Sequence, residues 1–114
     1  MGYGNGMQTV AETAHYRRRA AKVLTSAEQE AVIETLAEDP TCGVLLGGGI
    51  RKVRVAARSQ GKSGGARVIY YYFSTGAPIY LLEVFGKGEK ANLTKVEQTE
   101  LVKMAKLIAA THGE

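Results

Sequence analysis

Residues 50–58 have the sequence Ile-Arg-Lys-Val-Arg-Val-Ala-Ala-Arg, and residues 67–73 have the sequence Arg-Val-Ile-Tyr-Tyr-Tyr-Phe. In the first stretch apolar and basic residues alternate, which is typical of a β-strand with one buried and one exposed face. The second stretch is rich in β-branched and aromatic residues, which favour strands. A third strand is predicted over 79–85, after a turn at 75–78. Consecutive strands with short connections are expected to pair as an antiparallel meander.

Helices are predicted on either side of this strand region. The first covers 13–24, after a short strand that ends near residue 12, and begins with a threonine that can cap its first turn. A second helix begins at 25–26, where two capping-box patterns overlap, and ends before Pro40. The last helix begins at Thr94, which has capping-box spacing with Glu97.

The chain has 114 residues, which suits one compact domain. Residues 1–6 are expected to be a flexible leader, and residues 7–114 a single domain. No apolar run reaches membrane-spanning length, and the start does not resemble a signal peptide. With one cysteine, Cys42, no internal disulfide is possible, which suits a reducing cytoplasm. We expect Cys42 to be a half-buried small residue rather than a nucleophile, because no histidine lies near it in the sequence.

The net charge of +4 is distributed unevenly along the chain. Residues 26–39 contain five acids and no Lys or Arg, whereas residues 50–90 contain eight bases and only two acids. Neighbouring cations repel one another, and a bound polyanion relieves that repulsion. The imbalance therefore favours a polyanionic partner, although a solvated strand face is the alternative explanation. The eight bases are Arg51, Lys52, Arg54, Arg58, Lys62, Arg67, Lys87 and Lys90.

Strand geometry groups some of these bases. A period of two places Lys52 and Arg54 on one face, and Arg67 opens the neighbouring strand, where it can share that face. Lys87 lies where the third strand ends and could extend the basic patch, unless it belongs to a lysine-rich loop that serves solubility. If Arg67 faces the ligand, alternation puts Tyr71 on the same face, where its ring could stack on a base. Packing in the core is the ordinary alternative for that tyrosine.

Two other chemistries are disfavoured by the sequence. Residues 61–63, Gly-Lys-Ser, imitate the end of a phosphate-binding loop, but Ala56 stands where its first glycine should be, and the segment joins two strands. Lys62 could still contact a phosphate from a hairpin loop. His15 and His112 do not have metal-ligand spacing, so neither a metal nor a small-molecule cofactor is predicted. Lysine and arginine can themselves stabilise the phosphorane-like transition state formed when a ribose 2′-hydroxyl attacks its own phosphate.

Three stretches, 50–54, 61–72 and 85–94, resemble the RelE/HigB family of type II toxin–antitoxin toxins. The most specific part is the run Lys-Ser-Gly-Gly-Ala-Arg-Val-Ile-Tyr-Tyr at 62–71, and the resemblance extends from Met7 to about Ile108. It implies an α+β, RelE-like fold, with two N-terminal helices packed on a small twisted antiparallel sheet, plus a C-terminal helix. It also implies metal-independent, ribosome-dependent cleavage of mRNA in the A site by 2′-hydroxyl attack. A cognate antitoxin, often of the helix-turn-helix type, would neutralise the toxin.

The resemblance also implies which residues act. The basic catalytic strand residues of the family correspond to Lys52, Arg54 and Arg67, and Lys87 or Lys90 would be the basic residue after the last strand. The family often has Tyr-Ala-Lys-Asn-Glu-Lys where residues 85–90 are Phe-Gly-Lys-Gly-Glu-Lys, so a tyrosine hydroxyl is absent here. Further RNA contacts are expected from Arg51, Arg58, Lys62, Tyr71 and Lys90.

The same scaffold is compatible with two other functions, because fold alone does not decide activity. One is a non-catalytic or degenerate toxin that binds antitoxin and operator DNA, and the other is a gyrase inhibitor of the ParE type. A gyrase inhibitor does not need Lys52, Arg54 and Arg67 within reach of one phosphate. Side chains that point to opposite faces of the sheet would therefore weaken the nuclease hypothesis.

Overall fold

A computed structural model describes residues 9–58 and 65–112 of the chain. These residues form five strands and three helices. The expected leader at 1–6 and Lys62 lie outside the described residues. The elements are β1 (Val10–Glu12), α1 (Ala14–Val23), α2 (Ser26–Glu38), β2 (Val44–Gly47), β3 (Ile50–Val55), β4 (Ala66–Tyr71), β5 (Ile79–Gly86) and α3 (Lys95–His112). None of the described helices is both long and apolar enough to span a membrane.

The sheet has the strand order β1-β5-β4-β3-β2. The pairs from β2 to β5 are antiparallel, as the meander predicted, but β1 pairs with β5 in parallel, with Val10 opposite Ile79. The prediction of a purely antiparallel sheet is therefore wrong at this edge, and the α+β class is confirmed. The strand β2 was not predicted, because four residues, Val-Leu-Leu-Gly, show no alternation that separates a strand from a loop.

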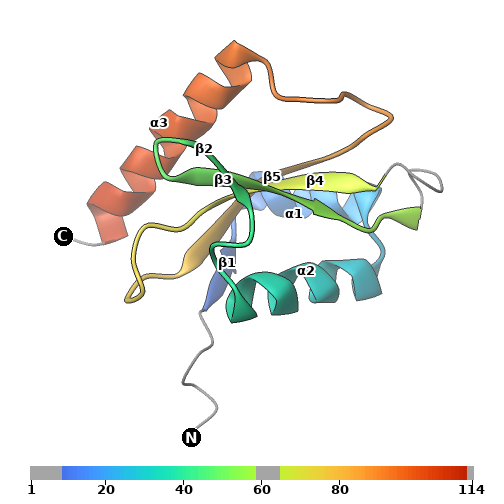
Figure 1. The fold of residues 1–114 in the computed structure, drawn as a ribbon, viewed down its shortest axis with the longest axis horizontal. Helices are drawn as coiled ribbons and strands as arrows, with labels where there is room; N and C mark the ends of the chain where they lie inside the picture. Colours follow the sequence, from blue (N-terminus) through green and yellow to red (C-terminus); the bar gives the residue numbers. More distant parts are fainter. Residues whose placement is uncertain (1–8, 59–64, 113–114) are drawn as a thin grey trace, which may run out of the picture.

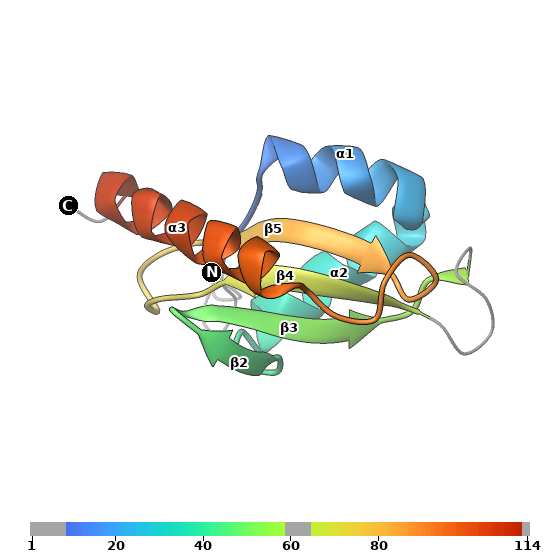
Figure 2. The same cartoon turned by 90° about the horizontal axis from the view of Figure 1, so that it is seen from above.

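Helices cover both faces of the sheet (Figures 1 and 2). Both N-terminal helices, α1 and α2, lie on one face, where Tyr16 and Leu36 join a buried cluster with Tyr70 of β4. The C-terminal helix lies on the other face, where Leu101 and Ala105 pack against a second cluster from β3, β4 and β5. The last helix thus packs an apolar stripe on this face of the sheet.

The predicted helix starts are also confirmed. The Thr13 hydroxyl accepts a hydrogen bond from the Tyr16 N–H at 3.1 Å and caps α1. Of the two overlapping capping boxes at α2, the structure forms the one between Thr25 and Glu28. The box of α3 forms as well, with the Glu97 side chain 2.9 Å from the N–H of residue 94.

Glycines in the turn between β2 and β3 allow this hairpin to lie close beneath α3. Gly48 and Gly49 have φ values of +63° and +86°, a region that other residues rarely adopt. A Cβ atom on Gly48 would lie 2.6 Å from a methyl group of Val102, and one on Gly49 would lie 2.5 Å from the Tyr71 ring. The hairpin therefore approaches both the helix and the sheet as closely as glycine permits. Just before β2, Cys42 is exposed, so the expectation of a half-buried cysteine is wrong.

Candidate nucleic-acid interface

The two central strands bring three cations onto one face of the sheet. Arg54 lies directly opposite Arg67 in the pairing of β3 with β4, and residues paired in this way project to the same side. Lys52 is two residues before Arg54 and shares that side. We call these three residues the basic face. The next residues on the same side, Ile69 and Tyr71, belong to the cluster under α3, so the basic face lies on the α3 side of the sheet.

The segment that follows β5 lies against the basic face. Phe85 is opposite Arg67 in the pairing of β4 with β5, and the Nζ atom of Lys90 is 5.0 Å from the centre of the Phe85 ring. This is a cation–π distance. The Nζ atom of Lys52 donates a hydrogen bond to the Oδ1 atom of Asn92 at 3.3 Å. Figure 1 shows the segment from β5 to α3 on the side of the sheet that α3 occupies.

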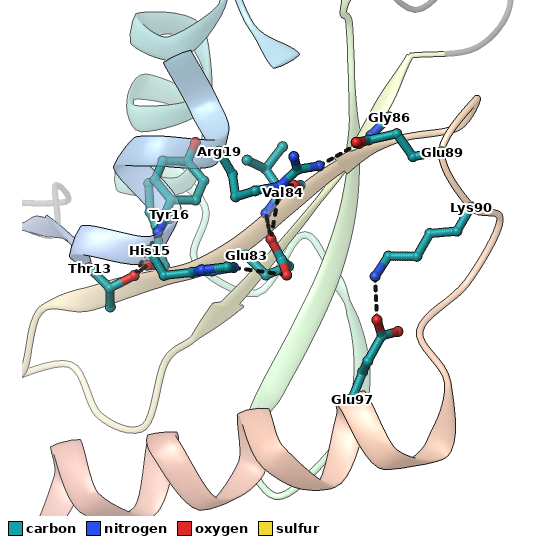
Figure 3. Close-up of polar contacts among 11 residues, drawn as sticks. Thr13, His15, Tyr16, Arg19, Glu83, Val84, Gly86, Glu89, Lys90 and Glu97 are labelled. Atoms are coloured by element: carbon teal, nitrogen blue, oxygen red, sulfur yellow. Dashed lines mark hydrogen bonds and ion pairs between the residues drawn. The ribbon is translucent and has the colours of Figure 1, made fainter. Parts of the chain in front are cut away.

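The two lysines of this segment have different surroundings. Lys90 donates to the Oε2 atom of Glu97 at 2.6 Å (Figure 3), and this hydrogen bond holds the pKa of Glu97 below its ordinary value. Lys87 is exposed in the turn, and its backbone N–H donates to the Gly65 carbonyl at 3.2 Å. The charge of Lys90 is therefore partly balanced by an acid, while Lys87 faces solvent beside the start of β4.

A network on the other side of β5 joins α1 to the same turn (Figure 3). The Oε2 atom of Glu83 lies 3.0 Å from the Nε2 atom of His15, and its Oε1 atom lies 3.7 Å from the Nε atom of Arg19. The Nη2 atom of Arg19 donates to Glu89 in the turn after β5. This hydrogen bond raises the pKa of Arg19 and lowers that of Glu89. The two acids of the 50–90 region are thus paired with α1 rather than with the basic face.

The structure places other predicted RNA contacts away from the basic face. Arg51 is paired with Tyr70, on the opposite side of the sheet from Lys52. Its Nη1 atom donates to the carbonyls of Gly43 at 2.9 Å and Thr41 at 3.3 Å, so it supports the connection from α2 to β2. Arg58 lies beyond the end of β3, where its backbone N–H donates to Glu28 at 2.9 Å. These two residues are not brought together with Lys52, Arg54 and Arg67.

The ring of Tyr71 lies on the predicted side of the sheet but inside the core. It is 7% exposed, and it stacks on Phe73 with ring centres 5.1 Å apart. Burial raises the pKa of its hydroxyl. A ring this buried packs the core, so the position does not support the predicted stacking on a base.

Sequence reasoning missed the side chains that surround the basic face. Asn92 and Phe85 contact Lys52 and Lys90 only because the segment after β5 folds back over the sheet. Arg19 belongs to a run of three arginines at 17–19, and unlike its two exposed neighbours its side chain is only 25% exposed. The available signal was helical spacing, since Arg19 is three residues after the buried Tyr16.

This arrangement suits a charged polymer better than a small ligand. Arg54 is exposed, and Lys52 and Arg67 are half-buried on a sheet surface, so their donors can reach a backbone that lies across the strands. Cationic donors placed around a phosphate stabilise the additional negative charge that develops when it is attacked. Within residues 9–58 and 65–112, no three His, Cys, Asp or Glu side chains are placed to hold a metal ion together.

A family model described as "RelE toxin of RelE / RelB toxin-antitoxin system" matches residues 8–114. Because the match covers nearly the whole chain, the chain belongs to the RelE toxin family.

Proposed function

We propose that this member of the RelE family is the toxin of a type II toxin–antitoxin system and acts as a ribosome-dependent mRNA endonuclease. The observation that carries the proposal is the convergence of Lys52, Arg54 and Arg67 on one side of the sheet. Three cations so close together are expected to bind consecutive phosphates of RNA. The family membership adds a cognate antitoxin of the RelB kind, and we expect the protein to act in the cytoplasm.

The proposed reaction is an attack by the 2′-hydroxyl of one nucleotide on the phosphate that follows it. The O2′–P bond forms, the P–O5′ bond breaks, and the products are a 2′,3′-cyclic phosphate and a 5′-hydroxyl. The proton leaves the 2′-oxygen, and another is delivered to the departing 5′-oxygen. No oxidant or reductant takes part, so the protein needs to orient the groups and stabilise charge.

Each cation of the basic face has a proposed role. Lys52 and Arg54, which lie on the same strand, orient the ribose and the phosphate and activate them for attack. Arg67, directly opposite Arg54, stabilises the negative charge that develops on the phosphate oxygens. Lys87 binds the adjacent phosphate from the turn after β5, and Lys90 contributes further binding when it exchanges Glu97 for the RNA backbone. We expect the ribosome to align the mRNA on this open sheet surface.

The test is primer extension on a transcript bound to ribosomes, with and without the purified protein. We expect cuts inside codons for the wild type. Arg67→Ala should reduce the cleavage rate by about 100-fold to 1,000-fold, the usual effect of removing one group that stabilises transition-state charge. Arg18→Ala, which removes an exposed arginine from α1, is the matched control and should cleave like the wild type.

Two results would count against the proposal. If the wild type leaves ribosome-bound transcripts intact, the chain is a non-catalytic member of the family or acts on another target, such as gyrase. If Arg67→Ala and Arg18→Ala cleave equally well, the basic face is not the catalytic surface.

A further inference from the structure

The turn after β5 is held from both sides of the sheet (Figure 3). Glu89 is bound by Arg19 of α1, whereas the next residue, Lys90, is bound by Glu97 of α3 at 2.6 Å. The two helices lie on opposite faces of the sheet (Figures 1 and 2). Consecutive residues of one short turn are therefore fixed to two different layers of the molecule.

Arg19 makes contacts that join the strand to the turn. Its Nε atom donates to the Val84 carbonyl at 3.3 Å and lies 3.7 Å from Glu83, so the side chain is fixed on β5. Its Nη2 atom reaches Glu89 in the turn. Because the Arg19 side chain is held on β5, its guanidinium determines the position of the Glu89 carboxylate.

Glu89 transfers this constraint to the backbone of the turn. Its Oε1 atom accepts a hydrogen bond from the Gly86 N–H at 2.8 Å, and its own N–H donates to the Gly86 carbonyl at 2.9 Å. These bonds close a loop around Lys87 and Gly88. Glycines on both sides of Lys87 would otherwise leave the segment many backbone conformations. The bonds of Glu89 therefore select the conformation that carries the Lys87 side chain.

The conformation of the turn determines the position of the Lys87 ammonium group relative to the basic face. The Lys87 N–H donates to the Gly65 carbonyl, and Gly65 is two residues before Arg67. An exposed ion pair adds little to the stability of a fold. The Glu89 side chain is 42% exposed, so we expect the pair to matter for geometry more than for folding.

We propose that Arg19, which belongs to α1 and not to the strands of the basic face, is a positioning residue that holds the Lys87 turn against the RNA through Glu89. This inference rests on the proposed function. Arg17 and Arg18 of the same run are exposed, so the three neighbouring arginines differ in role.

The experiment compares Arg19→Ala with Arg18→Ala, which makes the same chemical change on the same helix. Cleavage of ribosome-bound mRNA should fall about 10-fold to 100-fold for Arg19→Ala, as expected when a contacting group is misplaced by about an ångström. Arg18→Ala should stay within about twofold of the wild type, in line with an exposed site that has no special feature.

A double-mutant cycle with Lys87→Ala separates positioning from a general loss of structure. If Arg19 acts through Lys87, Arg19→Ala causes no further loss in a chain that already carries Lys87→Ala. If it merely destabilises the fold, the two losses multiply and the melting temperature falls. Glu89→Gln is the second variant in case Arg19→Ala does not fold, and it should reduce cleavage without adding to the effect of Arg19→Ala.

The amide signals of Lys87 and Gly88 in NMR spectra give a readout that does not depend on activity. We expect Arg19→Ala to increase the mobility of these two amides, and Arg18→Ala to leave them unchanged. Unchanged amides, or a cleavage rate for Arg19→Ala equal to that of Arg18→Ala, would overturn the inference. A wild type that fails to cleave would instead contradict the proposed function, and the amide signals would still decide whether Arg19 holds the turn.

Discussion

The hydroxyl of Tyr70 joins two parts of the chain that lie 30 residues apart in the sequence. It donates to the Pro40 carbonyl at 2.7 Å and accepts from the Gly43 N–H at 2.9 Å. Burial, the main cause, raises the pKa of this hydroxyl to about 12. A single side chain of β4 thus makes two hydrogen bonds to the connection between α2 and β2.

Removing this hydroxyl should destabilise the protein. Tyr70→Phe leaves a buried N–H and a carbonyl without their partner, which costs about 1–3 kcal/mol of unfolding free energy. The matched control is Tyr16→Phe. The Tyr16 hydroxyl is also buried but finds no hydrogen-bond partner in the part of the chain that the structure describes, so its removal should be neutral or stabilising. Urea unfolding of both variants is the measurement, and equal losses would contradict the assignment.

At the scale of elements, the helix starts depend on local side-chain bonds. In α2 the Thr25 hydroxyl accepts from the Glu28 N–H at 3.1 Å, and the Glu28 carboxylate accepts from the Thr25 N–H at 2.9 Å. These reciprocal bonds satisfy donors at the helix start that have no partner within the helix.

Thr25→Ala should therefore lower the free energy of unfolding by about 1 kcal/mol. Thr35→Ala is the control, because it makes the same change at an exposed position inside the same helix, and it should shift stability by no more than about 0.5 kcal/mol. Thermal unfolding followed by circular dichroism measures both. A Thr35→Ala loss as large as that of Thr25→Ala would mean that the capping box is not the cause.

Elements also show what could be read from local sequence. The capping boxes and Pro40 located the helices, because their signals lie within one helical turn. The strand β2 and the parallel pairing of β1 escaped prediction. Both depend on which partner a short segment meets in space, and this information is not contained in three or four residues.

At the scale of the whole molecule, three carboxylates respond to acid in the same direction. Glu28 is stabilised as an anion mainly by the Thr25 N–H, Glu89 by Arg19 and Glu97 by Lys90, so all three have pKa values below the ordinary 4.5. The folded state therefore binds protons more weakly than the unfolded state at these sites. Their stabilising contribution is fully present above pH 4.5, and it is lost as the pH falls below 4.5 and through the lowered values.

Carboxyl groups titrate at about pH 3 to 5. We therefore expect the melting temperature of the wild type to decrease as the pH is lowered from about 5 to about 3, and calorimetry across this range is the measurement. A triple variant with Glu28→Gln, Glu89→Gln and Glu97→Gln should melt lower at neutral pH and depend less on pH below 4.5. A triple variant with the pH dependence of the wild type would show that other groups control acid stability.

The sequence by itself determined the α+β class, the starts of the helices and the strand side that carries Lys52 and Arg54. These features follow from periodicity and from hydrogen bonds between residues at most four apart, so a short window contains them. The face that Arg67 shares with Lys52 and Arg54 could also be predicted, because alternation and hairpin pairing leave only two possible sheet faces for its side chain.

Only the tertiary structure decided what surrounds those cations. Arg51 turns to the α2 side to bind the Gly43 carbonyl, Tyr71 is buried beneath α3, and Arg19 reaches Glu89, 70 residues away in the sequence. Such contacts depend on how helices pack on the sheet and how the segment after β5 crosses it. Packing is set by the whole set of side chains at once, so no local pattern contains the answer.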